Sequence, residues 1–352
     1  MSDDAMTTST PTSTPATTPK AISISPISGH ITARRRQLIT ALVVFAALAL
    51  VPKLVSDVYL MNVLILTLLF AALSQSWNIL GGYCGQVSLG HALYFGIGAY
   101  ATSLLFVKFG IMPWVGLAAG GALAAALALL LGYPCFRLKG HYYSMATIVI
   151  AEAGLLLVHN WDYAGAALGI QWPFGRDSWW TLQFARDKAP YFYFVLGLFA
   201  VVWLVTFAIV ESRWGYWWRA VKDNPEAAES LGVTVFHSKM AAAGVSAFFT
   251  AIGGGFYAAF VSYIDPESVM QFRFSLLMAL PAVLGGIGSL WGPAVGALIL
   301  IPLAEFTRSY MGGTGSGLDL AVYGALIMVV SLTRPEGILS IFDGIGRKRA
   351  AS

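Results

Sequence analysis

The chain has 352 residues, of which 57% are hydrophobic and 11% charged, with a mean hydropathy of +0.72 and a net charge of +4. A soluble domain carries about 25% charged residues, so this composition excludes an ordinary soluble protein and predicts an all-α polytopic membrane protein. Two cysteines and five scattered histidines form neither a disulfide framework nor a metal-binding motif. We therefore expect no metal or other cofactor bound by the chain itself.

The first part of the chain, 1–33, is rich in Ser, Thr and Pro. We expect a disordered cytoplasmic tail, because so few apolar residues cannot offset the entropy cost of ordering it. Arg34, Arg35 and Arg36 then precede an apolar run. A secretory or twin-arginine signal is one interpretation, but a first membrane anchor held by cytoplasmic arginines is favoured.

Ten apolar segments are long enough to cross a bilayer as helices, since a span needs about 20 residues. The eighth is short and is followed by "GSLWGP", so it is either a full span or a re-entrant half-helix. The expected spans are 38–55, 58–80, 87–108, 113–133, 141–159, 190–210, 241–263, 275–290, 293–310 and 318–333.

Ten spans place both termini on the same side of the membrane. With that side inside, 14 of the 21 Lys and Arg residues are cytoplasmic, as the positive-inside rule requires. We therefore predict one membrane domain over 34–340, with a cytoplasmic loop at 211–239 and a tryptophan-rich external loop at 160–189. Residues 341–352 form a basic cytoplasmic tail.

Two GxxxG pairs are present: Gly116 with Gly120 inside an expected span, and Gly292 with Gly296 at the start of another. Small residues allow helix backbones to approach closely in lipid. Close packing within the chain is the favoured interpretation, and a subunit interface is the alternative.

The cytoplasmic loop contains "DNPEAAESLGV", a polar helix-forming stretch between two apolar runs. Asp223 or Asn224 can cap a helix, Pro225 suits its first position, Glu226 suits its first turn, and Gly232 ends it.

Ala227, Ala228 and Leu231 would give this helix one small apolar face. Such a face could fit a groove on another protein.

Polar residues inside the predicted spans are few. Glu152 lies in the middle of its span, where a charge costs about +2.5–3.5 kcal/mol, so we expect it to face the bundle interior or a wet cavity. It is either a path or gating residue, or a buried acid bonded to a neighbouring helix, for example to His91. His91 is likewise either a packed, hydrogen-bonded histidine or a transport residue. Gln86 and Ser88 precede it and could cap the helix or point towards the path.

Several motifs occur in the order found in one family. "GGYCGQVSLGHALYFGIGAYATSLL", "RLKGHYYSMATIVIAEA", "VLGGIGSLWGPAVGA" and "LTRPEGIL" resemble segments of the branched-chain amino acid permease family, closer to its LivM-type than to its LivH-type subunit. The EAAxxxG pattern formed by Glu226, Ala227, Ala228 and Gly232 resembles the coupling loop of ABC-importer permeases. The Ile-x-Leu-Pro that follows in that loop is absent here.

The resemblance implies one membrane subunit of a bacterial inner-membrane importer. Its partners would be a LivH-type permease, two ATPase subunits that use ATP, and a periplasmic solute-binding protein, with lipid around it and no nucleic acid. The chain has no GxxxxGK[ST] phosphate loop, so hydrolysis is expected in a partner and the chain is not an enzyme.

The resemblance also implies roles for the residues of the cytoplasmic loop. Asp223 and Glu226 would lie near the ATPase groove, whereas Arg219 and Lys222 would contact lipid head groups or acidic partner residues. The implied coupling surface comprises Arg219, Asp223, Glu226, Ala227, Ala228 and Gly232.

Other functions remain open from the sequence. Within the family, urea, short amides and small aromatic carboxylates are alternative substrates to branched-chain amino acids. A proton- or sodium-coupled secondary transporter would rely on Glu152 and His91 and need no ATPase. An intramembrane enzyme is disfavoured because no HExxH, paired acids or convincing Ser/His arrangement is present.

Overall fold

The computed structural model describes residues 27–339, except positions 56, 139, 174, 176, 185–186, 311–323, 326–327 and 329–336. The first helix begins at Ile27, six residues before the end expected for the N-terminal tail. The rest of that tail and the predicted basic tail at 341–352 lie outside the described residues.

The described residues are overwhelmingly helical, which confirms the predicted fold class. A π-helical turn, η1 (Ile79–Tyr83), extends the second helix, and the only strands among these residues are β1 (Ile170–Gln171) and β2 (Tyr263–Ile264). The α-helices are α1 (Ile27–Leu54), α2 (Val58–Asn78), α3 (His91–Phe109), α4 (Pro113–Cys135), α5 (His141–His159), α6 (Ala189–Glu211), α7 (Arg213–Asp223), α8 (Pro225–Ser230), α9 (Val235–Val261), α10 (Pro266–Met270), α11 (Phe272–Gly285) and α12 (Gly292–Tyr310).

Eight helical segments of the described chain are long and apolar enough to cross a membrane. α5 has the predicted bounds, 141–159, and most others differ by a few residues. The third expected span was placed too early, because residues 84–90 are not helical and α3 begins at His91. Most of the expected span at 318–333 lies outside the described residues.

The eighth span differs most from its prediction. It runs over Pro266–Gly285, starting nine residues before the expected 275 and ending before 290. Gln271 has an extended backbone conformation (φ −61°, ψ 142°) and divides it into α10 and α11. Pro266 and the capping box of Asp265 and Ser268 start α10, a local signal that hydropathy does not register.

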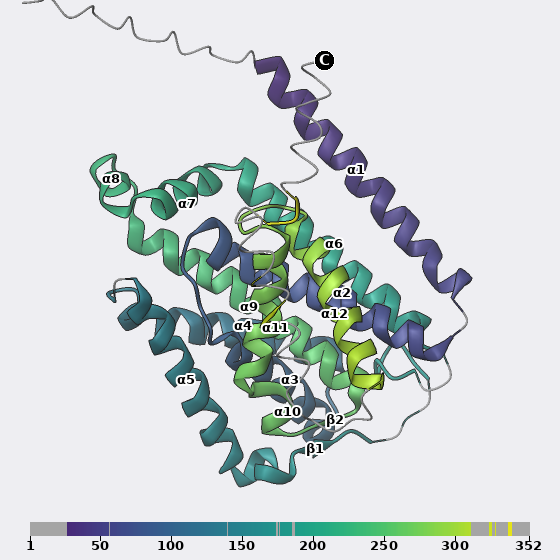
Figure 1. Ribbon diagram of the computed structural model, residues 1–352. Coiled ribbons are helices and arrows are strands. Elements are labelled where there is room, and N and C mark those ends of the chain that lie inside the picture. The colour runs from purple at the N-terminus through teal and green to yellow at the C-terminus, as the bar shows by residue number, and fades with distance from the viewer. Residues whose placement is uncertain are drawn as a thin grey trace, which may run out of the picture. The chain divides into compact units, whose positions relative to one another are not determined.

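Helices α3, α4 and α9 pack against one another through small residues (Figure 1). A Cβ atom on Gly98 of α3 would overlap the carbonyl oxygen of Ala251, and one on Gly254 of α9 would overlap that of Phe95. A Cβ on Gly116 of α4 would lie 2.8 Å from the Cα of Thr102. These contacts confirm that the first GxxxG pair serves packing within the chain.

A second group of helices surrounds α2, which packs against α6, α11 and α12 and also contacts α9. Here a Cβ on Gly296 of α12 would overlap the carbonyl oxygen of Pro281 in α11. The second GxxxG pair therefore also serves packing within the chain. Figure 1 shows α7 and α8 protruding at one end of the bundle, and α5 running along its edge.

The loop between α5 and α6 is anchored to the bundle. Residues 170–171 pair with 263–264 as two short antiparallel strands. Trp172 is fully buried and donates a hydrogen bond from Nε1 to the Oγ atom of Ser103, 2.8 Å away. Trp172 of this tryptophan-rich loop therefore packs inside the protein.

The close approach of α3 and α9 gives a test of the packing. We expect Gly254→Ala to destabilise the protein by about 1–3 kcal/mol, because the new methyl group collides with the Phe95 carbonyl. Gly197→Ala in α6 is the matched control: it has open space around the new Cβ and gains about 0.5–1 kcal/mol of helix propensity. Thermal unfolding in detergent measures both, and equal stability of the two variants would contradict the packing described here.

Candidate coupling surface and polar residues of the membrane domain

The protruding end of the bundle is made by α7 and α8. On α7, Trp218 and Val221 are buried in a cluster that includes Tyr83, Cys84 and Phe136. Arg219 is exposed, and its guanidinium donates a 3.0 Å hydrogen bond to the carbonyl oxygen of Val210 at the end of α6. α7 is therefore held to the membrane domain both by its apolar face and by this hydrogen bond.

The end signals of α8 follow the sequence prediction. Asn224, rather than Asp223, is the cap: its Oδ1 accepts hydrogen bonds from the backbone N–H groups of Glu226 and Ala227 at 3.0 and 3.1 Å. Pro225 occupies the first turn, and Gly232 follows the helix with a φ of +84°, a conformation that favours glycine. Asp223 is the last residue of α7 and is exposed.

The faces of α8 differ from the prediction. Ala228 is 2% exposed and packs in the cluster with Trp218, whereas Ala227 and Glu226 are exposed and Leu231 is 84% exposed. The expectation of one apolar face formed by Ala227, Ala228 and Leu231 is therefore wrong. Ala228 anchors α8 to its own chain, and Ala227 and Leu231 are exposed apolar residues at this end of the bundle.

A pocket of about 850 Å³ lies beside α8. Its lining comes from four segments: the loop after η1, the α4–α5 turn, the α7–α8 pair and the start of α9. Charged residues of both signs line it, and Gln86 shares it with Glu226. The charged side chains in the lining are Arg137, Lys222, Glu226, Glu229 and Lys239.

Cys84 lies in the loop after η1, close to this pocket. Burial raises the pKa of its thiol to about 12, although the positive charge of Lys239 acts to lower that pKa. Cys84 therefore stays a protonated packing residue at neutral pH.

His91 is the first residue of α3 and is fully buried. The Oγ atom of Ser246 donates to the carbonyl oxygen of Ser76 at 2.6 Å, so it accepts from Nε2 of His91 at 2.8 Å. The Oγ atom of Ser88 lies 3.2 Å from Nδ1 of His91 and donates to it in that tautomer. This arrangement fits the packed, hydrogen-bonded interpretation of His91 and not a bond to Glu152.

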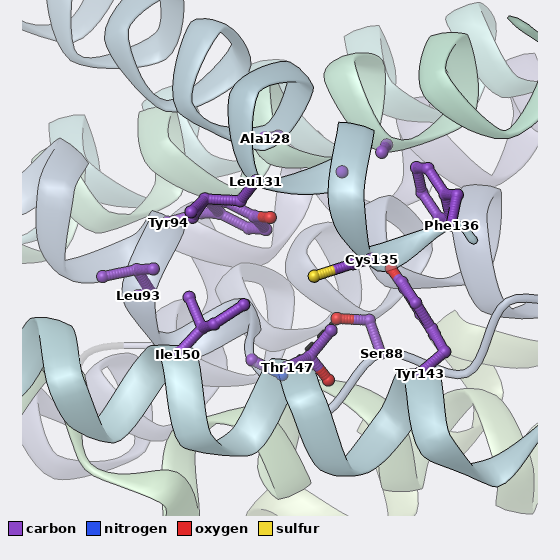
Figure 2. A pocket seen from close by; sticks show the side chains of 13 residues that line it. Ser88, Leu93, Tyr94, Ala128, Leu131, Cys135, Phe136, Tyr143, Thr147 and Ile150 are labelled. Carbon is purple, nitrogen blue, oxygen red and sulfur yellow. Dashed lines mark hydrogen bonds between the residues drawn. The ribbon is translucent and has the colours of Figure 1, made fainter. Parts of the chain in front are cut away.

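Ser88 also lines the small cavity drawn in Figure 2. Its hydroxyl, that of Thr147 and the side chains of Tyr143 and Cys135 face this space between α3, α4 and α5. At about 20 Å³ the cavity has room for little more than one water molecule. It is therefore too small to bind an amino acid in this conformation.

Glu152 does not lie inside this chain's helix bundle, contrary to the expectation for a charged residue in mid-span. It is exposed on α5, in a stripe with Met145, Val149 and Leu156, which are also exposed. Spacings of three and four residues place these four side chains on one face of the helix. The structure therefore leaves Glu152 for a neighbour outside the described chain or for water.

Two polar residues, Asn78 and Lys222, make contacts within the chain that the sequence did not predict. Asn78, at the end of α2, is fully buried and hydrogen-bonds the loop before α12. Lys222 was expected to contact lipid head groups or a partner, but its side chain lies beside Gly85 and Gly288 of its own chain. The sequence did offer a signal for Asn78, because its side-chain amide comes shortly before Gly81 and Gly82, where a helix is expected to end. A polar residue at a helix end often hydrogen-bonds backbone groups that the helix leaves unpaired.

Together these features define a polytopic, helical membrane subunit that presents a short anchored helix at one end. A family model described as the permease component of the branched-chain amino acid transport system matches residues 59–331. The chain belongs to this family of ABC transporter permeases.

Curated relatives agree with the family model. The high-affinity branched-chain amino acid transport system permease protein LivM of Escherichia coli is 28% identical, over 78% of this chain and 68% of its own. The corresponding LivH protein of E. coli is 24% identical, over 77% and 91%. A nucleoside ABC transporter permease protein, NupC, of Lactococcus lactis is 24% identical, over 74% and 87%. No solved structure matches the chain.

Proposed function

We propose that this chain is one of two membrane subunits of an ATP-driven importer in the bacterial inner membrane, with both termini in the cytoplasm. α8 docks on a separate ATPase subunit, a LivH-type permease completes the solute path, and a periplasmic protein delivers the solute. The observation that carries this proposal is α8 itself. Its inner residue, Ala228, is anchored in the chain's own core while Leu231 beside it is 84% exposed.

A helix held in this way is suited to transmitting force. The N-cap of Asn224 and the buried Ala228 fix α8 on α7, and the buried Trp218 and Val221 fix α7 on the membrane domain. A partner that displaces α8 would therefore move α7 and the helices packed against it, and not only a flexible loop. Isolated exposed leucines are common, but one that directly follows a short helix fixed to its own chain is a suitable anchor for a partner's groove.

The solute is proposed to be a branched-chain amino acid or a related small molecule. Relatives named for branched-chain amino acids include both LivM and LivH proteins, which supports this substrate class. The NupC relative is named for nucleosides, so a purine or pyrimidine nucleoside is the second candidate. Direct uptake assays with isotopically labelled leucine and uridine separate the two.

The docking role of α8 predicts the effect of a charge at its tip. In the assembled transporter, we expect Leu231→Arg to abolish co-purification of the ATPase subunits and ATP-dependent uptake, with little change in the thermal stability of the permease. Leu168→Arg is the matched control, because Leu168 is also 84% exposed but lies in the α5–α6 loop. Retention of the ATPase subunits and of uptake by Leu231→Arg would contradict the proposal.

The exposed stripe of α5 is proposed to face the solute path between the two permease subunits. A carboxylate facing lipid at mid-span costs about +2.5–3.5 kcal/mol, whereas a polar path removes most of this cost. Glu152 then contributes to a weakly polar wall, and Met145, Val149 and Leu156 contact the second permease.

Thiol labelling tests this placement. In an active background lacking Cys84 and Cys135, we expect Glu152→Cys to react with a charged, membrane-impermeant thiosulfonate in the assembled transporter. Leu123→Cys on α4, 56% exposed and also in mid-span, should react more slowly by about tenfold or more, because each unit by which lipid raises a thiol pKa lowers the thiolate fraction about tenfold. Equal, slow labelling at both positions would place Glu152 against lipid.

A further inference from the structure

Two non-helical loops interrupt the membrane domain near α7. The first loop, 84–90, joins η1 to α3, and the second loop, 286–291, joins α11 to α12. The second loop lies against the end of η1: a Cβ atom on Gly82 would stand 2.7 Å from the backbone nitrogen of Gly288, and one on Gly288 would stand 3.0 Å from the carbonyl oxygen of Gly82. The end of η1 and the second loop are therefore in direct backbone contact.

Asn78 fastens this contact. Its Nδ2 donates to the carbonyl oxygen of Ser289 at 2.9 Å, and its Oδ1 accepts from the backbone N–H of Gly288 at 2.8 Å. Both halves of a fully buried amide are thus used on the second loop. Because Asn78 is the last residue of α2, it connects the second loop directly to that helix.

Each loop is in turn fixed to the helix that follows it. Ser88 of the first loop bonds His91 at the start of α3, and its carbonyl oxygen accepts a 2.7 Å hydrogen bond from Nε1 of Trp77. Ser289 of the second loop accepts a 2.9 Å hydrogen bond from the backbone N–H of Gly292, the first residue of α12. Each loop is therefore hydrogen-bonded to the start of the helix that follows it.

Lys222, in the last turn of α7, lies beside both loops. Its Cγ, Cα and Cβ atoms lie 3.0–3.2 Å from the position that a Cβ on Gly85 would occupy. Its Nζ atom lies 3.2 Å from the corresponding position on Gly288. Gly85 and Gly288 both have positive φ (+74° and +76°), so neither position readily takes a side chain that would displace the lysine.

The charge of Lys222 suits this position. The carbonyl ends of η1 and α11 lie at the starts of the two loops, and the C-terminal end of a helix favours a cation. Lys222 is also exposed, beside Glu226 in the pocket next to α8. One side chain of the α7–α8 pair thus contacts both loops at the ends of membrane helices.

We infer that Lys222 and Asn78 are positioning residues that link α7–α8 to the two loops, so that displacement of α8 moves the starts of α3 and α12 together. This inference rests on the proposed function, because it requires an ATPase partner that moves α8. It adds a specific internal connection: Lys222 passes the movement from α7 to the loops, and Asn78 keeps the second loop attached to α2.

The test uses the complete transporter, with the ATPase subunits, reconstituted in liposomes. We expect Lys222→Met, which keeps the stem and removes the charge, to retain ATPase binding and ATP hydrolysis while uptake per ATP hydrolysed falls by about fivefold or more. Lys222→Arg should restore most of the uptake. Asn78→Asp, which keeps the acceptor for Gly288 and loses the donor to Ser289, should show the same uncoupling.

Arg213→Met is the matched control, since Arg213 is an exposed cation at the opposite end of α7. It should leave the ratio of uptake to hydrolysis unchanged. A normal ratio in Lys222→Met, or loss of ATPase binding by that variant, would overturn the inference. Failure of the wild-type chain to bind an ATPase would instead overturn the proposed function, so the two failures are distinguishable.

Discussion

Lipid offers the backbone no hydrogen-bond partner, and the breaks in this chain's helices show how that constraint is met from within. Where helical bonding stops after η1, Trp77 and Thr147 bond the backbone of the first loop. Where it stops after α11, Asn78 and Ser289 do the same for the second loop. Several buried polar residues, including Asn78, Ser88 and Thr147, therefore lie at these breaks and hydrogen-bond the backbone there.

The same constraint explains the glycines. Helices in lipid gain nothing from burying apolar surface against each other rather than against acyl chains, so they associate through close packing. Gly98 and Gly254 bring α3 and α9 into backbone contact, and Gly116 does so for α4. The result is a compact group of helices that leaves α5, with Glu152 on its exposed face, for other interactions.

Much of this fold could be predicted from the sequence, because hydropathy and end signals are local. The bounds of α5 and the cap, first turn and glycine stop of α8 follow directly from residue type. Hydropathy does not tell which way a side chain faces in the assembled bundle. Ala228 was therefore placed outward and Glu152 inward, and the structure reverses both. The contacts of Asn78 join residues more than 200 positions apart and depend on tertiary packing alone.

The proposed function requires that a separate partner, which hydrolyses ATP, moves this chain through α7 and α8. Its most direct test is solute accumulation in liposomes containing the two permease subunits and binding protein, with and without the ATPase subunits, after the proton and sodium gradients are collapsed. We expect accumulation only when the ATPase and ATP are both present. Accumulation by the permease subunits without the ATPase subunits, in a parallel experiment with an imposed proton or sodium gradient, would overturn the proposed function.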